Sequence, residues 1–304
     1  MNKKRILLVN EASFLTTGYA TYGREVLRRL YATGKYEIAE IGCYSSPENL
    51  RNLEVEWKFY PNIPASNDAA AIQEYQSLKI NEFGAWKFNE VLLDFKPDIV
   101  FNFTDWWMSE YIERSPLRRH YHYAHMPTVD ALPLDDQWIA TYKGVDSLFS
   151  YTDWGVKVLR DYGLNPIGSA PPGADLGVYY PKGNKQQTKQ TMGLPENALV
   201  VGTVMRNQIR KLFPDLIQAF SLFLERAPAS IAERSYLYLH TGFPDMGYHI
   251  PRLIKESGCA RRILMTYVCG TCRAAYGSVY TDVRNTCKKC GSYNVTLVNS
   301  TAGI

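Results

Sequence analysis

The chain has 304 residues, of which 46% are hydrophobic and 21% charged, so it is an ordinary globular protein with room for about two domains. Its net charge of +4 arises almost wholly between Lys255 and Lys289, where seven basic residues face two acidic ones. The remainder is close to neutral, and bulk charge therefore gives no general nucleic-acid or membrane-surface role. The N-terminal apolar run is too short for a signal peptide and no stretch could span a bilayer, which predicts a cytoplasmic protein.

The first half of the chain alternates predicted strands and helices. A strand, a glycine-bearing loop and a helix in succession open a Rossmann-like half. The loop contains Gly18 but neither GxGxxG nor a P-loop, so it is a weak nucleotide-binding signal, and Gly18 is equally well explained as a turn glycine. The predicted strands are 5–10, 36–43, 96–103, 145–151 and 167–171, and the predicted helices are 19–31, most of 67–95, and 153–162.

Aromatic side chains beside a carboxylate follow the third predicted strand. Asp105, Trp106 and Trp107 would lie at the carboxyl edge of the sheet, where ligands bind in open α/β folds. Such a group suits a sugar, although aromatic rings are also ordinary core material.

An irregular segment comes next, at 119–138. It carries three of the five histidines, and two prolines break regular structure within it. Loops of this kind on a rigid scaffold often carry chemistry. His125 is the best candidate side chain in this segment.

The segment 198–226 predicts a strand, a turn and a helix. Residues 199–204 are short, β-branched and almost wholly apolar, as expected for a parallel strand buried on both faces. Arg206 and Lys211 follow at its carboxyl end, ahead of a helix with a first-turn proline. Two fixed cations at this edge suggest a diphosphate, with solvated loop charges as the alternative.

Three later strands complete what can be predicted from apolar runs: 199–204, 235–240 and 262–267. A cysteine pattern follows them. Cys269 and Cys272 form one CxxC pair, and Cys287 and Cys290 form a second after fourteen residues. This spacing predicts a zinc ribbon, and four thiolates close the coordination sphere, so the zinc would be structural. Nothing indicates an oxidising compartment, which disfavours disulfides, while ligand type alone leaves iron as an alternative.

Several segments, taken in order, resemble glycosyltransferase family 4 (group 1), retaining enzymes with the GT-B fold of two facing Rossmann-like domains. PPGADLGVYYP at 171–181 resembles the family's Pro-x-Gly-x-Asp segment ending in Phe-x-Pro, with tyrosine for phenylalanine. VGTVMRNQIRK at 201–211 resembles its strand-Arg-turn-Lys segment, and His125-Met126-Pro127 resembles its His-x-Pro. The stretch from MPTVDALPLDDQW to YTDWGVKVL resembles members found in phage and environmental sequences.

The resemblance implies transfer of a sugar from a nucleotide-diphosphate sugar to an acceptor hydroxyl, with retention of anomeric configuration. Arg206 and Lys211 would hold the diphosphate, so the transfer itself needs no metal. Gly18 would allow close approach near the phosphates, and His125 would contact the donor sugar. Asp130 would be an acceptor-side carboxylate, or else a solvated loop residue. The sequence does not specify the nucleotide, the sugar, the acceptor or the oligomeric state.

The predicted domain organisation is an acceptor-side Rossmann-like domain at 1–181, a linker at 182–197, and a partial donor-binding Rossmann-like domain at 198–304. The zinc ribbon is an insertion at 266–298. A donor-binding half should have about six strands, and three are predicted before the ribbon. The family's later pair of glutamates also has no counterpart, so we expect the chain to lack its C-terminal portion.

Two other functions remain open. One is a nucleic-acid-binding protein whose ribbon contacts phosphates. The simpler interpretation of the ribbon is a structural clamp that holds a loop of the second domain in place. The other is a glycosyltransferase remnant that binds without transfer. The basic residues available to a nucleic-acid surface are Arg261, Arg262, Arg273, Arg284, Lys288 and Lys289.

Overall fold

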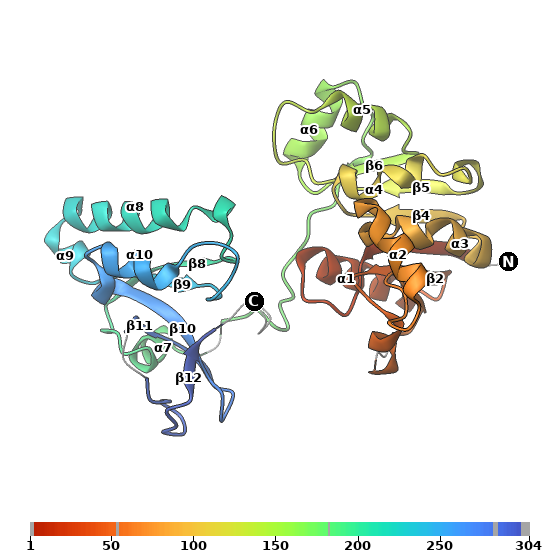
Figure 1. The fold of residues 1–304 in the computed structure, drawn as a ribbon. Helices are drawn as coiled ribbons and strands as arrows, with labels where there is room; N and C mark the ends of the chain where they lie inside the picture. The colour runs from red at the N-terminus through yellow and green to blue at the C-terminus, as the bar shows by residue number, and fades with distance from the viewer. Residues whose placement is uncertain (1–2, 53–54, 182, 282–284, 299–304) are drawn as a thin grey trace. The chain divides into compact units, whose positions relative to one another are not determined.

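The chain forms two compact α/β units, Met1–Asp175 and Leu176–Ile304 (Figure 1). The computed structural model describes residues 3–52, 55–181, 183–281 and 285–298. The division between the units, after Asp175, lies within the segment 171–181 that resembles a family motif. The predicted domain boundaries, and the acceptor-side and donor-binding roles of the two domains, stay predictions. Over the described ranges, no helix is both long and apolar enough to cross a membrane.

The first unit is built on a seven-stranded parallel sheet with the order β3-β2-β1-β4-β5-β6-β7. The chain winds outward from β1 through β2 to β3, then returns to place β4 on the other side of β1. This reversal is the switch point at whose carboxyl edge doubly wound sheets bind ligands. The strands are β1 (Lys4–Glu11), β2 (Tyr36–Cys43), β3 (Lys58–Pro61), β4 (Ile99–Asn102), β5 (His122–His125), β6 (Ser147–Ser150) and β7 (Gly168–Ser169).

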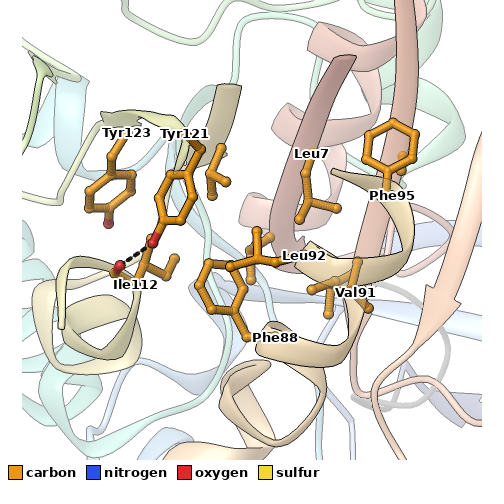
Figure 2. Close-up of a cluster of buried hydrophobic side chains, with 12 residues drawn as sticks. Leu7, Phe88, Val91, Leu92, Phe95, Ile112, Tyr121 and Tyr123 are labelled. Atoms are coloured by element: carbon orange, nitrogen blue, oxygen red, sulfur yellow. Dashed lines mark hydrogen bonds between the residues drawn. The ribbon is translucent and has the colours of Figure 1, made fainter. Parts of the chain in front are cut away.

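Helices cover both faces of this sheet because successive strand residues point to opposite sides. On one face, the apolar stripe of α3 packs on Leu7, Val9 and the buried Tyr121 and Tyr123 (Figure 2). On the other face, Leu8 packs with Leu27 of α1. The helical segments are α1 (Gly18–Ala32), η1 (Pro47–Asn52), α2 (Ala69–Ser77), η2 (Lys79–Phe83), α3 (Ala85–Phe95), α4 (Trp106–Glu113), η3 (Arg118–His120), α5 (Asp136–Lys143) and α6 (Asp153–Asp161).

The second unit has a sheet in the order β11-β10-β9-β8, with β12 also paired to β10. β8, β9 and β10 are parallel, whereas β11 and β12 run antiparallel to β10. α8 and α10 cover one face, and α7 with its following turn covers the other (Figure 1). The elements are α7 (Lys185–Thr191), β8 (Leu199–Val204), η4 (Ile209–Lys211), α8 (Phe213–Arg226), α9 (Ala229–Ala232), β9 (Ser235–His240), α10 (Ile250–Glu256), η5 (Ala260–Arg262), β10 (Ile263–Cys269), β11 (Ala275–Val279) and β12 (Val295–Leu297).

The prediction that residues 199–204 are buried on both faces is wrong. β8 is an edge strand whose pairing, within the described part of the chain, is with β9 alone. Val201 and Val204 are 45% and 75% exposed. Apolar β-branched composition reports strand propensity and does not distinguish a central strand from an edge strand.

The segment 119–138 is also more regular than predicted. His122–His125 forms β5, which lies between β4 and β6 in the sheet. The prolines at 127 and 133 lie beyond this strand, so they limit its length without preventing it.

Candidate functional site

Two cations lie at the carboxyl end of β8 in the second unit. Arg206 lies two residues beyond the strand, and Lys211 closes η4. α8 follows at once from Leu212, whose φ of 50° is in the left-handed region, and no described side chain caps the helix. The positive end of the α8 dipole thus faces the loop that holds both cations, an arrangement suited to an anion.

Arg206 is paired with a carboxylate from the neighbouring loop. Its Nε and Nη2 donate to Oδ2 and Oδ1 of Asp245, each at 3.1 Å. Asp245 follows β9, which runs parallel to β8, so both residues lie at the same edge of the sheet. The Arg206 side chain is 53% exposed and that of Asp245 only 2%. Hydrogen bonds from Arg206 hold the pKa of the Asp245 carboxyl below its usual range.

Gly18 is the first residue of α1 and is exposed. A cleft of about 500 Å³ opens beside it, lined by the first turns of α1 and by residues 171–175. The Gly18 backbone lies outside the left-handed region, and no described atom comes within 4 Å of the place where a Cβ would stand. The backbone therefore does not require a glycine here, so the conformation of the turn does not explain why residue 18 is a glycine.

His125, the last residue of β5, is completely buried. Its ring centroid lies 5.5 Å from that of Tyr123 and 5.9 Å from that of Tyr142. Burial lowers the pKa of His125 to about 3, so the ring is neutral, and its Nε2 finds no partner among the described residues. Asp130, five residues further on, is exposed. The roles given to His125 and Asp130 stay predictions.

A polar network spans the switch point of the first sheet. The Tyr19 hydroxyl donates to Oδ1 of Asp105 at 3.1 Å and lies 2.8 Å from Oγ1 of Thr128. These residues follow β1, β4 and β5 respectively. Trp107, in the first turn of α4, is 46% exposed and packs edge-on against Phe83 with centroids 5.0 Å apart. A carboxylate and two hydroxyls thus meet beyond the carboxyl ends of these strands, with an exposed indole two residues after the carboxylate, and such groups suit a sugar.

The four predicted cysteine ligands come together in the second unit. Their sulfur atoms all lie within 4.8 Å of one another, and the pairs Cys269–Cys290 and Cys272–Cys287 are each separated by 3.6 Å. A tetrahedral ion with metal–sulfur bonds of about 2.3 Å needs sulfur–sulfur edges of about 3.8 Å. A hydrogen bond from the Cys272 backbone lowers the pKa of the Cys269 thiol, which favours a thiolate at that position, whereas the pKa of the Cys290 thiol is raised, against a hydrogen bond from the Ser292 backbone, by the neighbouring Cys272 sulfur. The cluster therefore fits a four-thiolate metal ion.

Both CxxC pairs adopt the same turn. The residue after each second cysteine has a positive φ, 60° at Arg273 and 72° at Gly291. In both turns this residue donates its N–H to the carbonyl of the first cysteine at 2.9 Å. The N–H of that cysteine donates in turn to the carbonyl of the residue after the positive-φ position, at 2.9 and 2.8 Å. Glycine suits this position, so Arg273 occupies it at a cost of about 1 kcal/mol.

Contacts of the ribbon's basic residues fit the clamp interpretation. Lys288 donates from Nζ to the carbonyl of Thr191, at the end of α7, at 3.1 Å, and lies over the ring of Tyr276. Arg262 is likewise engaged, with a backbone carbonyl and a tyrosine ring. Two of the six cations considered for nucleic acid thus bind within the unit, and Arg284 lies outside the described residues.

The sequence correctly predicted that the four cysteines cluster and named Arg206 and Lys211 as candidates, a role that stays a prediction, but it did not indicate Asp245. The carboxylate lies 39 positions after Arg206 and has no motif of its own. The sequence could have indicated it, because the loops after residues 199–204 and 235–240 each follow a predicted parallel strand, and the carboxyl ends of such strands share one edge of the sheet.

No protein-family model and no curated protein matches this sequence. Solved structures do match. Sucrose-phosphate synthase from Thermosynechococcus elongatus is 13% identical with a TM-score of 0.61, over 86% of this chain and 69% of that one. The N-terminal domain of Candida albicans trehalose-6-phosphate phosphatase is 11% identical with a TM-score of 0.57, over 94% and 73%. An E. coli trehalose-6-phosphate protein bound with UDP-2-fluoro glucose is 12% identical with a TM-score of 0.51, over 84% and 69%.

At these identities the likeness establishes the fold alone, and one fold can host several chemistries. These neighbours are GT-B proteins, and the parallel sheet of the first unit and the parallel strands β8, β9 and β10 of the second match that architecture. The chain has a GT-B-type α/β fold.

Proposed function

We propose that this chain is a retaining glycosyltransferase that moves a sugar from a nucleotide-diphosphate sugar to an acceptor hydroxyl. The observation that carries the proposal is Arg206, an exposed guanidinium at the carboxyl end of β8 beside the positive end of α8. Lys211, in the same loop, supplies a second cation. In a GT-B-type fold, fixed cations at this edge suit a diphosphate leaving group.

In the proposed step, a bond forms between the acceptor oxygen and the anomeric carbon on the face of the sugar from which the diphosphate leaves, so that the anomeric configuration is retained. The bond from that carbon to the diphosphate oxygen breaks, and the diphosphate leaves with the electron pair. Arg206 and Lys211 stabilise the negative charge that develops on it, which is the part of the barrier that preorganised cations lower most. The exposed carboxylate of Asp130 takes the acceptor proton.

The first unit also carries residues that we assign to substrate binding. Gly18 leaves open space at the N-terminus of α1, as close approach of a phosphate would require. His125 has a neutral ring and an Nε2 without a partner among the described residues, but its side chain is completely buried, so its contact with the sugar requires a local rearrangement around the end of β5. Asp105 precedes α4 and Trp107 lies in its first turn, and we assign both to an acceptor that carries a sugar ring.

The metal in this proposal is structural zinc. Cys269, Cys272, Cys287 and Cys290 would hold it, and four protein ligands leave no position open for a substrate. Its contribution is to fix the ribbon, which reaches α7 through Lys288. A nucleic-acid-binding ribbon has less support, because Lys288 and Arg262 are engaged inside the unit.

The test is hydrolysis of UDP-glucose and of GDP-mannose by the zinc-loaded chain, followed by proton NMR before the released sugar mutarotates. The proposal expects the α-anomer first and loss of release in Arg206→Ala. Arg210→Ala is the matched control, because Arg210 is an exposed cation of η4, in the same loop between β8 and α8 as Arg206. First appearance of the β-anomer would contradict retention, and release that survives Arg206→Ala would contradict the assigned diphosphate site.

A further inference from the structure

Asp245 is not a passive partner of Arg206. We propose that it is a positioning residue, which holds the guanidinium in the orientation that accepts a phosphate group of the nucleotide. This inference rests on the proposed function, because it concerns the same diphosphate site. Three features carry it: the edge of the guanidinium that Asp245 occupies, the anchoring of the carboxylate, and the bonding between the two loops.

The geometry of the pair leaves a second edge of Arg206 open. A guanidinium has five N–H donors arranged along two forks, one formed by Nε and Nη2 and the other by Nη1 and Nη2. Asp245 occupies the first fork with both of its oxygens. The hydrogens on Nη1 and the outer hydrogen on Nη2 form the second fork, which can take two oxygens of a phosphate side by side. The ion pair and a bound phosphate are therefore compatible.

The carboxylate is itself fixed in place. Its Oδ1 accepts the backbone N–H of Met246 at 2.7 Å, and its side chain is 2% exposed. A buried carboxylate with an anchored oxygen orients its partner, whereas a mobile surface pair would not. Arg206, at 53% exposed, thereby loses much of its side-chain freedom before any ligand arrives.

The loops that carry the two residues are bonded to each other next to the ion pair. Asn207 is completely buried, donates to the carbonyl of Tyr248 at 2.7 Å and accepts its N–H at 2.8 Å. The Tyr248 hydroxyl donates to the carbonyl of Ile209 at 3.0 Å. A Cβ on Gly247 would lie 2.7 Å from the backbone of Asn207, so the loops meet too closely for any side chain there. These contacts therefore hold the loop after β9, and with it the backbone of Asp245, in a fixed position relative to the loop that carries Arg206.

The negative charge of Asp245 acts in the opposite direction, since it offsets part of the attraction that Arg206 exerts on an anion. It lies on the fork away from the open edge, and Lys211 adds a cation that no described carboxylate pairs with in an ion pair. Orientation therefore outweighs the lost charge, and neutralising Asp245 should weaken nucleotide binding. A carboxylate that merely competed with phosphate would give the reverse.

The test compares Asp245→Asn with the wild type by calorimetric titration of UDP and of GDP. We expect a roughly tenfold loss of affinity, the size of one charge-assisted contact, and a fall in melting temperature of no more than about 5 °C, because the Arg206 side of the ion pair is half exposed. Asp245→Asn should cost nothing further on an Arg206→Ala background, but its cost should add fully to that of Lys211→Ala. Glu256→Gln, which changes the carboxylate of the exposed Arg252–Glu256 pair, is the matched control. A gain in affinity, or full additivity with Arg206→Ala, would overturn the proposal.

A second readout separates this inference from the proposed function. The Arg206 Nε–H should exchange slowly with solvent in the nucleotide-free wild type, as seen by nitrogen-15 NMR, and rapidly in Asp245→Asn. Slow exchange without binding of UDP or GDP would reject the nucleotide site and leave Arg206 positioned. Fast exchange in the wild type would reject the positioning role even if nucleotides bind.

Discussion

Removal of the metal from the four-cysteine site should destabilise the second unit and leave the first unchanged. The perturbations are chelation and the substitution Cys287→Ser, which deletes one ligand of a cluster whose sulfurs lie within 4.8 Å of one another. Structural zinc contributes about 10–16 kcal/mol to the folding of isolated zinc-binding peptides. The ribbon therefore should not keep its turns without the ion.

The cost to the rest of the unit follows from what the ribbon buries. Tyr276, Val295 and Leu297 pack partly buried against the core under α8 and α10, and Val298 is 6% exposed. At about 1–1.5 kcal/mol for each such side chain, loss of the ribbon should remove about 4–6 kcal/mol. In a unit of this size 1 kcal/mol corresponds to about 3–5 °C. The melting temperature of the second unit should fall by about 12–30 °C.

The assay is differential scanning calorimetry, with metal content measured by emission spectrometry. Two transitions are expected, because the units have separate cores. Cys259→Ser is the matched control, since Cys259 belongs to the same unit but not to the cluster. An unchanged melting temperature of the second unit in a metal-free chain would refute this reasoning. So would a metal-free chain whose ribbon residues give a dispersed NMR spectrum, because dispersion would show that the ribbon folds without metal.

Three further predictions follow from the described geometry. His125→Phe should flatten the pH dependence of stability. In the wild type, folding lowers the pKa of His125 from about 6.5 in the unfolded chain to about 3. The wild type therefore loses stability as the pH falls from about 6.5 towards 3, by up to about 5 kcal/mol. Urea titrations of both proteins at pH 7 and pH 4 check this, and parallel pH dependence would contradict it. Gly18→Ala should raise the melting temperature slightly, because the Cβ enters open space and alanine lowers the entropy of the unfolded chain, yet it should weaken UDP binding in a calorimetric titration. Unaltered affinity would argue against close approach of phosphate. Arg273→Gly should stabilise the ribbon by about 1 kcal/mol by relieving the positive φ, measured as slower metal loss to a chromogenic chelator, and equal or faster loss would argue against strain there.

The parts of the fold predictable from sequence were those with local signals. Residues 199–204 and 235–240 form strands with the predicted bounds, because short β-branched runs between turns leave little choice. The predicted helix at 153–162 is found as Asp153–Asp161 for the same kind of reason, a strong 3.6-residue apolar period. The two CxxC pairs predicted a cluster that the structure assembles within 4.8 Å.

The features that were missed depend on distant parts of the chain. β8 is an edge strand because of where it lies in the sheet, and its own apolar sequence cannot report that position. His125 carries no sign of complete burial in its local sequence, since the two tyrosine rings around it come from β5 and from α5. Asp245 is likewise identified only once β9 is placed beside β8.

The central claim is that Arg206 and Lys211 hold the diphosphate of a nucleotide sugar. The most direct measurement is calorimetric titration of the zinc-loaded chain with UDP-glucose and GDP-mannose, repeated on the Arg206→Ala, Lys211→Ala double variant. The account predicts binding of at least one nucleotide sugar by the wild type and its loss in the double variant. Binding that persists in the double variant, or a folded zinc-loaded chain that binds neither ligand, would contradict the claim.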